Sequence, residues 1–511
     1  MSDVSSEGLF PADQLTRIPV DQQPTPPAVG KRFAAYDPHA VTLMPEALDD
    51  WLPDNHLARL VADLVDTELD LSDFYTSYTA TKGRPPYDPR MMVKILIYGY
   101  CTGVRSSRKL EVACTDMVTF RWLAAGAAPD FRAFSRFRRR HLHALAGVFT
   151  QVLSLCRAAG MVSLGTIALD GTKVNANASR RKAMSYNRLV AAEEQLAGKV
   201  ADLLAAVEAT DADEDTRYGD TRGDELPDEL ATTTARLAKI RAAKKQIDDE
   251  HAAAARAAAQ KKSRDDGDDD TTVADKSQAA EDKAVNKGPK PTEQRNFTDP
   301  DARIMKQPHG GFDYSYNAQA IVDADNQVIV STELDNNAAD SRTFIPMMTG
   351  VFDLAADPDG PGPGGAGGAG GARLVPGECL ADAGYCSAEN LRFAAQLEKV
   401  YGEVGTGFYV ATGRLRHGER VPDSPRGPVP EGATGRELMG RRLKTKKGAA
   451  VYAKRKKVVE PVFGQIATRQ GKHVLLRGLD AARCEWRLIA GCHNVLKLLS
   501  FRGRNAAGTL V

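Results

Sequence analysis

The sequence has few cysteines for its length of 511 residues, and none is arranged as a metal ligand. Its seven cysteines are scattered, without a C-x-x-C pair or a Cys/His cluster, so a zinc ribbon or a disulfide framework is not expected. No run of about 18 apolar residues occurs, and the first thirty residues lack the apolar core of a signal peptide. We therefore expect a cytoplasmic protein without a membrane partner.

Nucleotide-binding loops are also missing. No Gly-x-Gly-x-x-Gly follows a predicted strand, and the Gly/Pro-rich stretch at 357–372 precedes no Gly-Lys-Ser/Thr, which argues against a dehydrogenase or a P-loop kinase. The formal net charge is only +1, but the charges are unevenly placed. Basic residues crowd into 84–140 and 414–457, whereas 208–230 and 264–282 are acidic. Local basic surfaces of this kind neutralise phosphates.

The hydrophobic pattern divides the chain into parts of different character. Residues 1–35 have no apolar period and predict a flexible tail, and residues 36–160 have apolar positions at helical spacing and predict an all-helical domain. The remaining parts are a mixed β-sheet domain at 161–185 and 296–511, a coiled-coil-like helical hairpin inserted at 186–262, and a polar, disordered linker at 263–295. The predicted fold class is therefore α/β, with a helical domain before an interrupted sheet domain.

The helical domain carries basic residues in patterns that predict DNA contact. A helix that begins at Pro89 and ends before Gly103 is followed by another that begins near Ser106, and this short-turn pair resembles a helix-turn-helix. Residues 131–140 then alternate phenylalanine with arginine, which favours a DNA-facing helix; a solvated basic helix with buried phenylalanines is the alternative. The predicted DNA contacts here are Arg84, Arg108, Lys109, Arg136, Arg138, Arg139 and Arg140.

The strand order of the second domain predicts its topology. Short apolar or alternating runs occur at 164–170, 314–322, 327–334, 378–382 and 408–411. Helices are expected after the third strand, where Asp340 and Ser341 are placed to cap one, after the fourth, and at 450–466. Without the insertion, this is the element order of a ribonuclease-H-like fold, a mixed sheet with helices on its faces.

Three acids stand where this fold could bring them together. Asp170 and Asp382 each end an apolar strand, and Glu460 lies on the late helix after two valines. The first and fourth strands are neighbours in such a sheet, so we expect the two aspartates to lie close. Carboxylates suit hard cations such as Mg²⁺, and two such ions can stabilise both oxygens of an in-line phosphodiester displacement. A carboxylate that only caps a turn is the alternative for each.

Five phrases carry a resemblance to a known family. They are Gly83-Arg84-Pro85-Pro86-Tyr87-Asp88-Pro89, Asp170-Gly171-Thr172-Lys173-Val174-Asn175-Ala176, Tyr316-Asn317-Ala318-Gln319, Ala381-Asp382-Ala383-Gly384-Tyr385 and Val459-Glu460-Pro461-Val462-Phe463-Gly464. In this order, over residues 33–499 apart from much of the insertion, they resemble bacterial insertion-sequence transposases of the DDE class. The resemblance implies a helical domain for terminal-repeat DNA, a ribonuclease-H-like catalytic domain, and Asp170, Asp382 and Glu460 as its catalytic, metal-binding triad.

The surroundings of the glutamate depart from the family. Its members often place Tyr-x-x-Arg-x-x-x-Glu-x-x-x-x-x-x-Lys on one helix. Here Tyr452 and Arg455 each stand one residue early, and Ala467 takes the lysine position. We expect Tyr452, Arg455 and Lys456 to contact phosphate near the scissile bond; generic basic surface is the alternative.

The resemblance also implies a reaction and its partners. Two Mg²⁺ or Mn²⁺ ions would serve cleavage at terminal inverted repeats and joining of the 3′ hydroxyls to target DNA, by a homodimer at the bacterial nucleoid. The inserted helices are either part of the dimer interface or an inert addition. Two alternatives remain: a catalytically inactive DNA-binding regulator derived from a transposase, and a metal-dependent nuclease without strand transfer.

Overall fold

The computed structural model describes residues 47–78, 85–218, 228–265, 269–307, 310–356, 375–413 and 427–508. The predicted tail at 1–35, the Gly/Pro-rich stretch at 357–372 and Arg84 lie outside these ranges. Residues 1–50 and 51–511 form two compact units, and the second holds every element discussed below. Within the described ranges, no helix is both long and apolar enough to cross a membrane.

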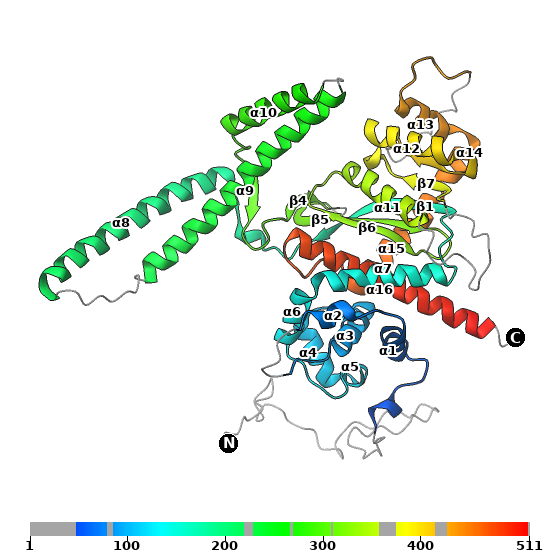
Figure 1. The fold of residues 1–511 in the computed structure, drawn as a ribbon, viewed down its shortest axis with the longest axis horizontal. Helices are drawn as coiled ribbons and strands as arrows, with labels where there is room; N and C mark the ends of the chain where they lie inside the picture. Colours follow the sequence, from blue (N-terminus) through cyan, green and yellow to red (C-terminus); the bar gives the residue numbers. More distant parts are fainter. Residues whose placement is uncertain are drawn as a thin grey trace, which may run out of the picture. The chain divides into compact units, whose positions relative to one another are not determined.

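The first part of the larger unit is helical, as predicted (Figure 1). Its helices are α1 (Leu57–Thr67), α2 (Ser72–Thr76), α3 (Pro89–Thr102), α4 (Ser107–Asp116), α5 (Val118–Leu123), α6 (Phe131–Arg140) and α7 (Leu142–Ala158). The Asp88 carboxylate caps α3 by accepting the Arg90 N–H at 2.7 Å, and proline is tolerated in that first turn. Gly103, with φ +86°, ends α3 and allows the tight turn into α4.

The helical part shares its core with the sheet. Helix α7 packs along α16 (Leu479–Gly508), which also covers the sheet. At the buried junction the Tyr100 hydroxyl donates to Glu485 at 3.0 Å, and Arg105 pairs with the same carboxylate at 3.3 Å. The boundary predicted at residue 160 therefore marks a change of secondary structure and not a break in the core.

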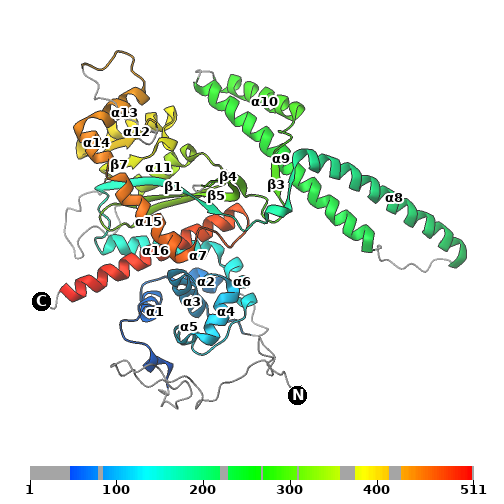
Figure 2. The same ribbon diagram turned by 180° about the vertical axis from the view of Figure 1, so that it is seen from behind.

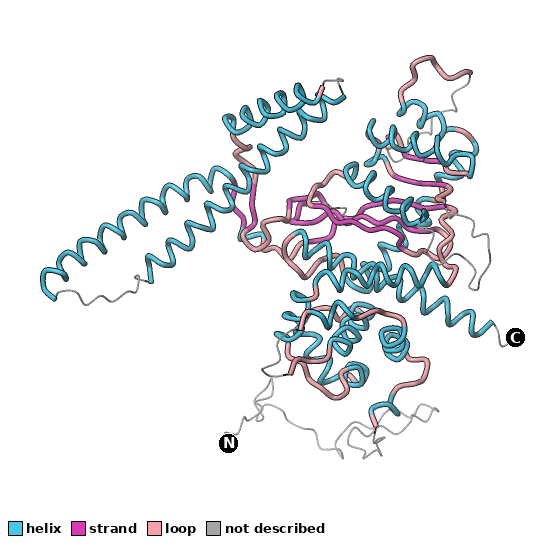
Figure 3. The backbone as a smooth tube through the Cα atoms, viewed as in Figure 1, coloured by secondary structure: helices cyan, strands magenta, loops and turns pink. Residues whose placement is uncertain are grey.

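The sheet has the predicted ribonuclease-H-like order (Figure 3). Its strands are β1 (Thr166–Asn175), β4 (Arg303–Lys306), β5 (Phe312–Asp323), β6 (Ile329–Asp335), β7 (Glu378–Ala381) and β8 (Gly407–Val410). Strand β5 runs antiparallel to β1 and pairs with β4 and β6 along its other edge. Strands β7 and β8 continue the sheet on the far side of β1, both parallel to it.

Helices cover both faces of the sheet (Figures 1 and 2). Helices α11 (Phe344–Ala356) and α12 (Ala388–Tyr401) lie on one face, where Phe344 packs against Phe408 with ring centres 6.1 Å apart. Helices α15 (Arg455–Gln470) and α16 lie on the other, where the Trp486 indole N–H donates to the Gln319 carbonyl at 3.1 Å. Helices α13 (Gly435–Lys444) and α14 (Lys446–Tyr452) precede α15.

Strand β1 is longer than predicted, so Asp170 lies in its middle and not at its tip. Pairing with β5 continues from Gly171 to Asn175, and the Asn175 N–H donates to the Lys472 carbonyl at 2.8 Å. Apart from the buried Val174, these additional residues are only partly buried and are not apolar, which is why they lack an apolar strand pattern.

The insertion between β1 and β5 contains more structure than predicted. Helices α8 (Tyr186–Tyr218) and α9 (Asp228–Asp265) form the expected hairpin around a small core of Leu189, Ile240, Ala243 and Ile247. The predicted disorder of residues 263–295 is wrong, because α10 (Asp270–Lys287) packs on α9 and β3 (Gln294–Asn296) pairs with β2 (Ala183–Ser185). The sparse buried positions of α10, at Val273, Ser277 and Ala284, are enough to seat it.

Candidate active site

The first two predicted acids lie on neighbouring strands. In the parallel pair β1–β7, Leu169 is opposite Ala381, so Asp170 and Asp382 follow at the same level of the sheet, where strands lie about 4.8 Å apart. One Asp170 oxygen accepts the Gly171 N–H at 2.8 Å. Asp382 caps the short helix η6 (Ala383–Tyr385) by accepting the Gly384 N–H at 2.7 Å. The structure thus brings these two aspartates together, as expected.

Arg455, at the start of α15, joins this pair. Its guanidinium lies 2.6 Å from the second Asp170 oxygen, and the two side chains are only 12% and 17% exposed. Burial raises the pKa of Asp170, an effect that Arg455 opposes and the negative charge of Asp382 reinforces. Burial also raises the pKa of the half-buried Tyr452, which lies close enough to feel Arg455 and both aspartates. Four predicted site residues therefore share one electrostatic environment.

Glu460 and Lys456 lie on an exposed side of α15. Both side chains are exposed, and among the described residues no hydrogen bond or ion pair joins Glu460 to Asp170 or Asp382. One turn further along α15, however, Phe463 and Gly464 line a groove of about 450 Å³ whose other wall includes Thr172 of β1. Glu460 therefore stands beside the opening between α15 and the strand that carries Asp170.

The groove between α15 and β1 also contains a position at which this sequence departs from the family pattern. Ala467, at the position where the family often has lysine, lines it and supplies no charge. Lys472, which follows α15, lines it as well. Sequence spacing alone did not single out Lys472, because the residue lies beyond the helix that carries the pattern.

A second group that sequence reasoning missed lies next to the aspartates. Asp340 was expected to cap a helix, but Ala339 occupies the cap of η5 (Asp340–Thr343). The Asp340 carboxylate instead accepts the side-chain amides of Asn317 at 2.7 Å and Gln319 at 3.0 Å. The available signal was the alternation of two amides, Asn317 and Gln319, with alanines along β5.

The donor set suits a hard divalent cation. Asp170 and Asp382 present carboxylate oxygens and no nitrogen or sulfur ligand, which is the chemistry that Mg²⁺ and Mn²⁺ prefer. The Asp170 oxygens each have one partner, a backbone N–H and the Arg455 guanidinium, and so retain further lone pairs. The Arg455 guanidinium places a positive charge beside the Asp170 carboxylate, as a bound metal ion would.

Among the predicted DNA contacts, Arg138 is a correction. Its side chain is buried, donates to the Arg105 carbonyl and lies over the Tyr100 ring, with 5.7 Å to the ring centre. It faces the core because α6 turns residues 134, 137 and 138 inward together. Arg138 therefore contributes to packing and is not placed to meet DNA.

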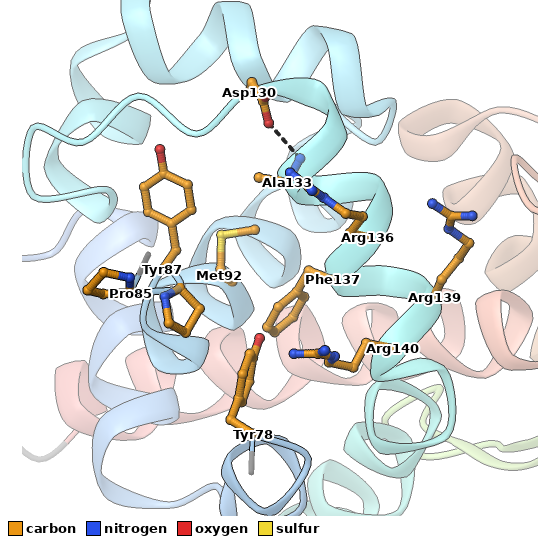
Figure 4. Close-up of a pocket in the computed structure, with 11 residues that line it drawn as sticks. Tyr78, Pro85, Tyr87, Met92, Asp130, Ala133, Arg136, Phe137, Arg139 and Arg140 are labelled. Atoms are coloured by element: carbon orange, nitrogen blue, oxygen red, sulfur yellow. Dashed lines mark hydrogen bonds between the residues drawn. The ribbon is translucent and has the colours of Figure 1, made fainter. Parts of the chain in front are cut away.

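The other arginines of α6 are exposed. Arg136, Arg139 and Arg140 line an open pocket of about 690 Å³ together with aromatic residues, as Figure 4 shows. Arg140 lies over the Tyr78 ring at 4.6 Å from its centre, and Tyr87 contributes another wall. The surface combines arginine with aromatic rings, a combination that fits nucleic acid.

The first turn of α4 adds two more cations. Arg108 and Lys109 are both exposed, and the Ser106 hydroxyl caps the helix by accepting the Lys109 N–H at 3.2 Å. Arg108 lies over the Phe131 ring at 5.4 Å, which connects this turn to the start of α6. The predicted contacts of α4 and α6 therefore belong to adjoining surfaces.

Comparison with known proteins matches the helical part and the sheet domain to two separate transposase families. Residues 46–140 match the family described as a transposase domain (DUF772), and residues 287–495 match the transposase DDE domain; together the matches span more than half of the chain. The second match includes Asp382 and Glu460, whereas Asp170 precedes it. No curated protein and no solved structure matches. With the ribonuclease-H-like sheet and its paired aspartates, these matches show that the chain belongs to the DDE transposases, phosphoryl-transfer enzymes of DNA transposition.

Proposed function

We propose that this transposase moves an insertion sequence by binding its terminal inverted repeats, cleaving DNA at its ends and joining the freed 3′ hydroxyls to target DNA. Asp170, Asp382 and Glu460 are its catalytic residues. The observation that carries the proposal is the register of β1 and β7, which sets Asp170 beside Asp382. Helix α15, which bears Glu460, contacts β1 directly.

The three carboxylates hold two Mg²⁺ or Mn²⁺ ions in this proposal. Bound there, the ions supply charge stabilisation for the attacking and leaving oxygens of an in-line displacement. The chain itself contributes positioning: β1 and β7 fix the aspartates, and α15, which bears Glu460, forms a groove with β1. No histidine or cysteine is needed.

Arg455 has two partners in the reaction cycle. In the protein alone its guanidinium neutralises Asp170. With metal ions bound beside Asp170, the Arg455 guanidinium would be available for a DNA phosphate, whose oxygens it binds as readily as a carboxylate. Tyr452 and Lys456 lie on either side of Arg455 in the chain and contact the same phosphate backbone.

The helical part holds the DNA end. Arg108, Lys109, Arg136, Arg139 and Arg140 are exposed and track phosphates, which carries affinity but little sequence information. Arg84, which lies outside the described residues, is a further phosphate contact in this proposal. Two element ends must meet for transposition, so the working unit is a homodimer on DNA, located at the nucleoid in the bacterial cytoplasm, with the inserted helices α8 and α9 available as part of its interface.

One observation favours a second candidate. Glu460 is exposed, and its spacing from Arg455 departs from the family pattern. An inactive, DNA-binding regulator would tolerate both features. A nuclease without strand transfer is separated from a transposase only by its products.

The test is cleavage and joining of a labelled DNA end from the flanking element with Mg²⁺ or Mn²⁺. Wild type is compared with Asp170→Asn, Asp382→Asn and Glu460→Gln, and with Asp353→Asn on α11 as a control at an exposed carboxylate. We expect joined strands from wild type and the control only, with DNA binding retained throughout. Binding without cutting by wild type would establish the regulator, and cutting without joining the nuclease.

A further inference from the structure

Two glycines that follow Asp170 and Asp382 in the chain pack tightly against one cluster of polar side chains, which includes Gln319 and Asp340. A side chain at Gly171, directly after Asp170, would collide with the amide of Gln319. A Cβ at Gly384, two residues after Asp382, would lie 2.6 Å from an Asp340 oxygen, closer than real Cβ atoms come, and 3.0 Å from an Asp382 oxygen, tighter than most real Cβ contacts. The backbone next to each aspartate therefore packs against side chains of this one cluster.

That cluster is fully hydrogen-bonded around Asp340. One Asp340 oxygen accepts from the amides of Asn317 and Gln319 and from the Lys173 ammonium, the last at 3.3 Å. Gln319 also donates to the Asn317 carbonyl oxygen at 2.8 Å and accepts the hydroxyl of Tyr385. The other Asp340 oxygen is the one directed at Gly384. Asp340 thus links β1, β5 and η6 through a single carboxylate.

The cluster is also tied to the loops that carry it. The buried Asn390 donates its amide to the Ser341 carbonyl at 2.8 Å and to the Tyr385 carbonyl at 2.9 Å. These bonds hold η5, which contains Asp340, against η6, which Asp382 caps. A shift of Asp340 would therefore be transmitted to the Asp382 turn.

The electrostatics place the three acids around one phenol. Tyr385 is completely buried, and burial raises its pKa well above the ordinary value. The negative charges of Asp340, Asp170 and Asp382 reinforce the rise, in that order. The charge of Asp340 therefore affects this hydroxyl at least as strongly as the charges of Asp170 and Asp382 do.

We propose that Asp340 is a positioning residue for the metal site: through Gln319, Tyr385 and the turn at Gly384, it holds Asp170 and Asp382 in the geometry that binds divalent cations. The inference rests on the proposed function, because it assumes that these aspartates bind metal. The physical reason is that partners behind the ligands fix their orientation, and losing such a partner typically weakens metal affinity about 10- to 100-fold. Lys173 pairs with Asp340 at 3.3 Å, and both side chains are largely buried.

The experiment is a direct titration of the full-length protein with Mn²⁺, in which electron paramagnetic resonance measures the free ion. We expect Asp340→Asn to weaken Mn²⁺ binding about 10- to 100-fold while most of the protein remains folded. Asp382→Asn is the reference for a lost ligand. Thermal unfolding of each variant measures the folded fraction.

Asp299→Asn is the matched control. Asp299 is fully buried and accepts the hydroxyl of Tyr316 on β5 at 2.8 and 3.0 Å, so it is a buried, hydrogen-bonded carboxylate that packs against β5 outside the cluster around Asp340. We expect this variant to lose stability and to retain the Mn²⁺ affinity of wild type in its folded fraction. A general loss of sheet stability would affect both variants alike.

Gly384→Ala tests the same idea without removing any polar group. Its methyl group would displace the Asp340 and Asp382 oxygens, so we expect weaker Mn²⁺ binding here too. Wild-type affinity in both Asp340→Asn and Gly384→Ala, with binding lost in Asp382→Asn, would overturn the inference and leave the proposed function standing. Wild-type affinity in Asp382→Asn would instead refute the metal site itself. A loss that only follows the unfolded fraction would make Asp340 merely structural.

Discussion

Replacing Arg455 with methionine removes the only side-chain cation that the described structure pairs with Asp170, at 2.6 Å, and keeps much of the side-chain length. Breaking a buried ion pair by removing one partner costs about 3–5 kcal/mol, because the other charge is left uncompensated. The two side chains remain 12% and 17% exposed, so the lower end, about 3 kcal/mol, applies. At about 2.1 cal/mol/K of unfolding entropy per residue, a change of that size lowers the unfolding midpoint of the compact unit formed by residues 51–511 by about 3 °C.

The loss should depend on pH in a defined direction. Burial raises the pKa of Asp170 in the folded protein, so its bound proton stabilises the fold fully below the ordinary value of 3.8, and this stability is lost as pH rises through the raised pKa. Removing Arg455 raises that pKa further, which enlarges the loss at neutral pH. The difference between wild type and Arg455→Met should therefore be largest near pH 7.5 and shrink toward pH 4.

A double-mutant cycle measured by thermal unfolding isolates the pair. Asp170→Asn removes the stranded charge, so the double variant should be more stable at pH 7.5 than Arg455→Met alone, by about 2–3 kcal/mol. Mn²⁺ should raise the midpoint of Arg455→Met more than that of wild type, because the ion restores positive charge beside Asp170. Equal midpoints for wild type and Arg455→Met at pH 7.5, or no recovery in the double variant, would refute this reasoning.

Three further outcomes follow from the structure. Arg139→Ala and Arg140→Ala should each weaken binding to any DNA duplex, and each should reduce the slope of log affinity against log salt concentration by about 1, measured by fluorescence anisotropy. Replacing the buried Arg138 with alanine should instead lower the thermal unfolding midpoint. Lys472→Met should reduce strand joining at an unchanged midpoint, because its side chain lines the groove beside Ala467; normal joining would exclude this role. Gly103→Ala should cost at least about 1–2 kcal/mol, since φ is +86° and the Arg469 carbonyl lies against it, whereas the unhindered Gly413→Ala should be neutral in the same melting assay.

The fold was predictable where the hydrophobic pattern was strong. Five strands and their order follow from apolar runs, and they suffice for the ribonuclease-H-like topology. The pattern failed where burial is partial. Residues 171–175 extend β1 with Val174 as their single apolar side chain, and α10 buries only a few small or apolar positions, so neither resembles a core element in sequence. In both cases tertiary pairing outweighs local composition.

The candidate site was predictable only in part, for a similar reason. Asp170 and Asp382 stood out because each follows an apolar run, and strand order alone makes them neighbours. The partner of Asp170 was not predictable from spacing, since Arg455 lies 285 residues away. The local sequence around Asp340 predicted a helix cap. Only the packing of β5 against η5 shows that its carboxylate instead accepts hydrogen bonds from the side-chain amides of Asn317 and Gln319.

The shared core explains how a bound DNA end can be held relative to the aspartates. Two adjacent residues of α16 face different parts of the protein: Glu485 binds Tyr100 and Arg105 in the helical part, and Trp486 binds the backbone of Gln319 in β5. Gln319 in turn contacts the cluster that supports Asp170 and Asp382. A continuous chain of buried contacts therefore runs from the helices proposed to bind DNA to the site proposed to cut it. Because these contacts belong to one hydrophobic core, they hold the helices proposed to bind DNA against the sheet that carries the aspartates.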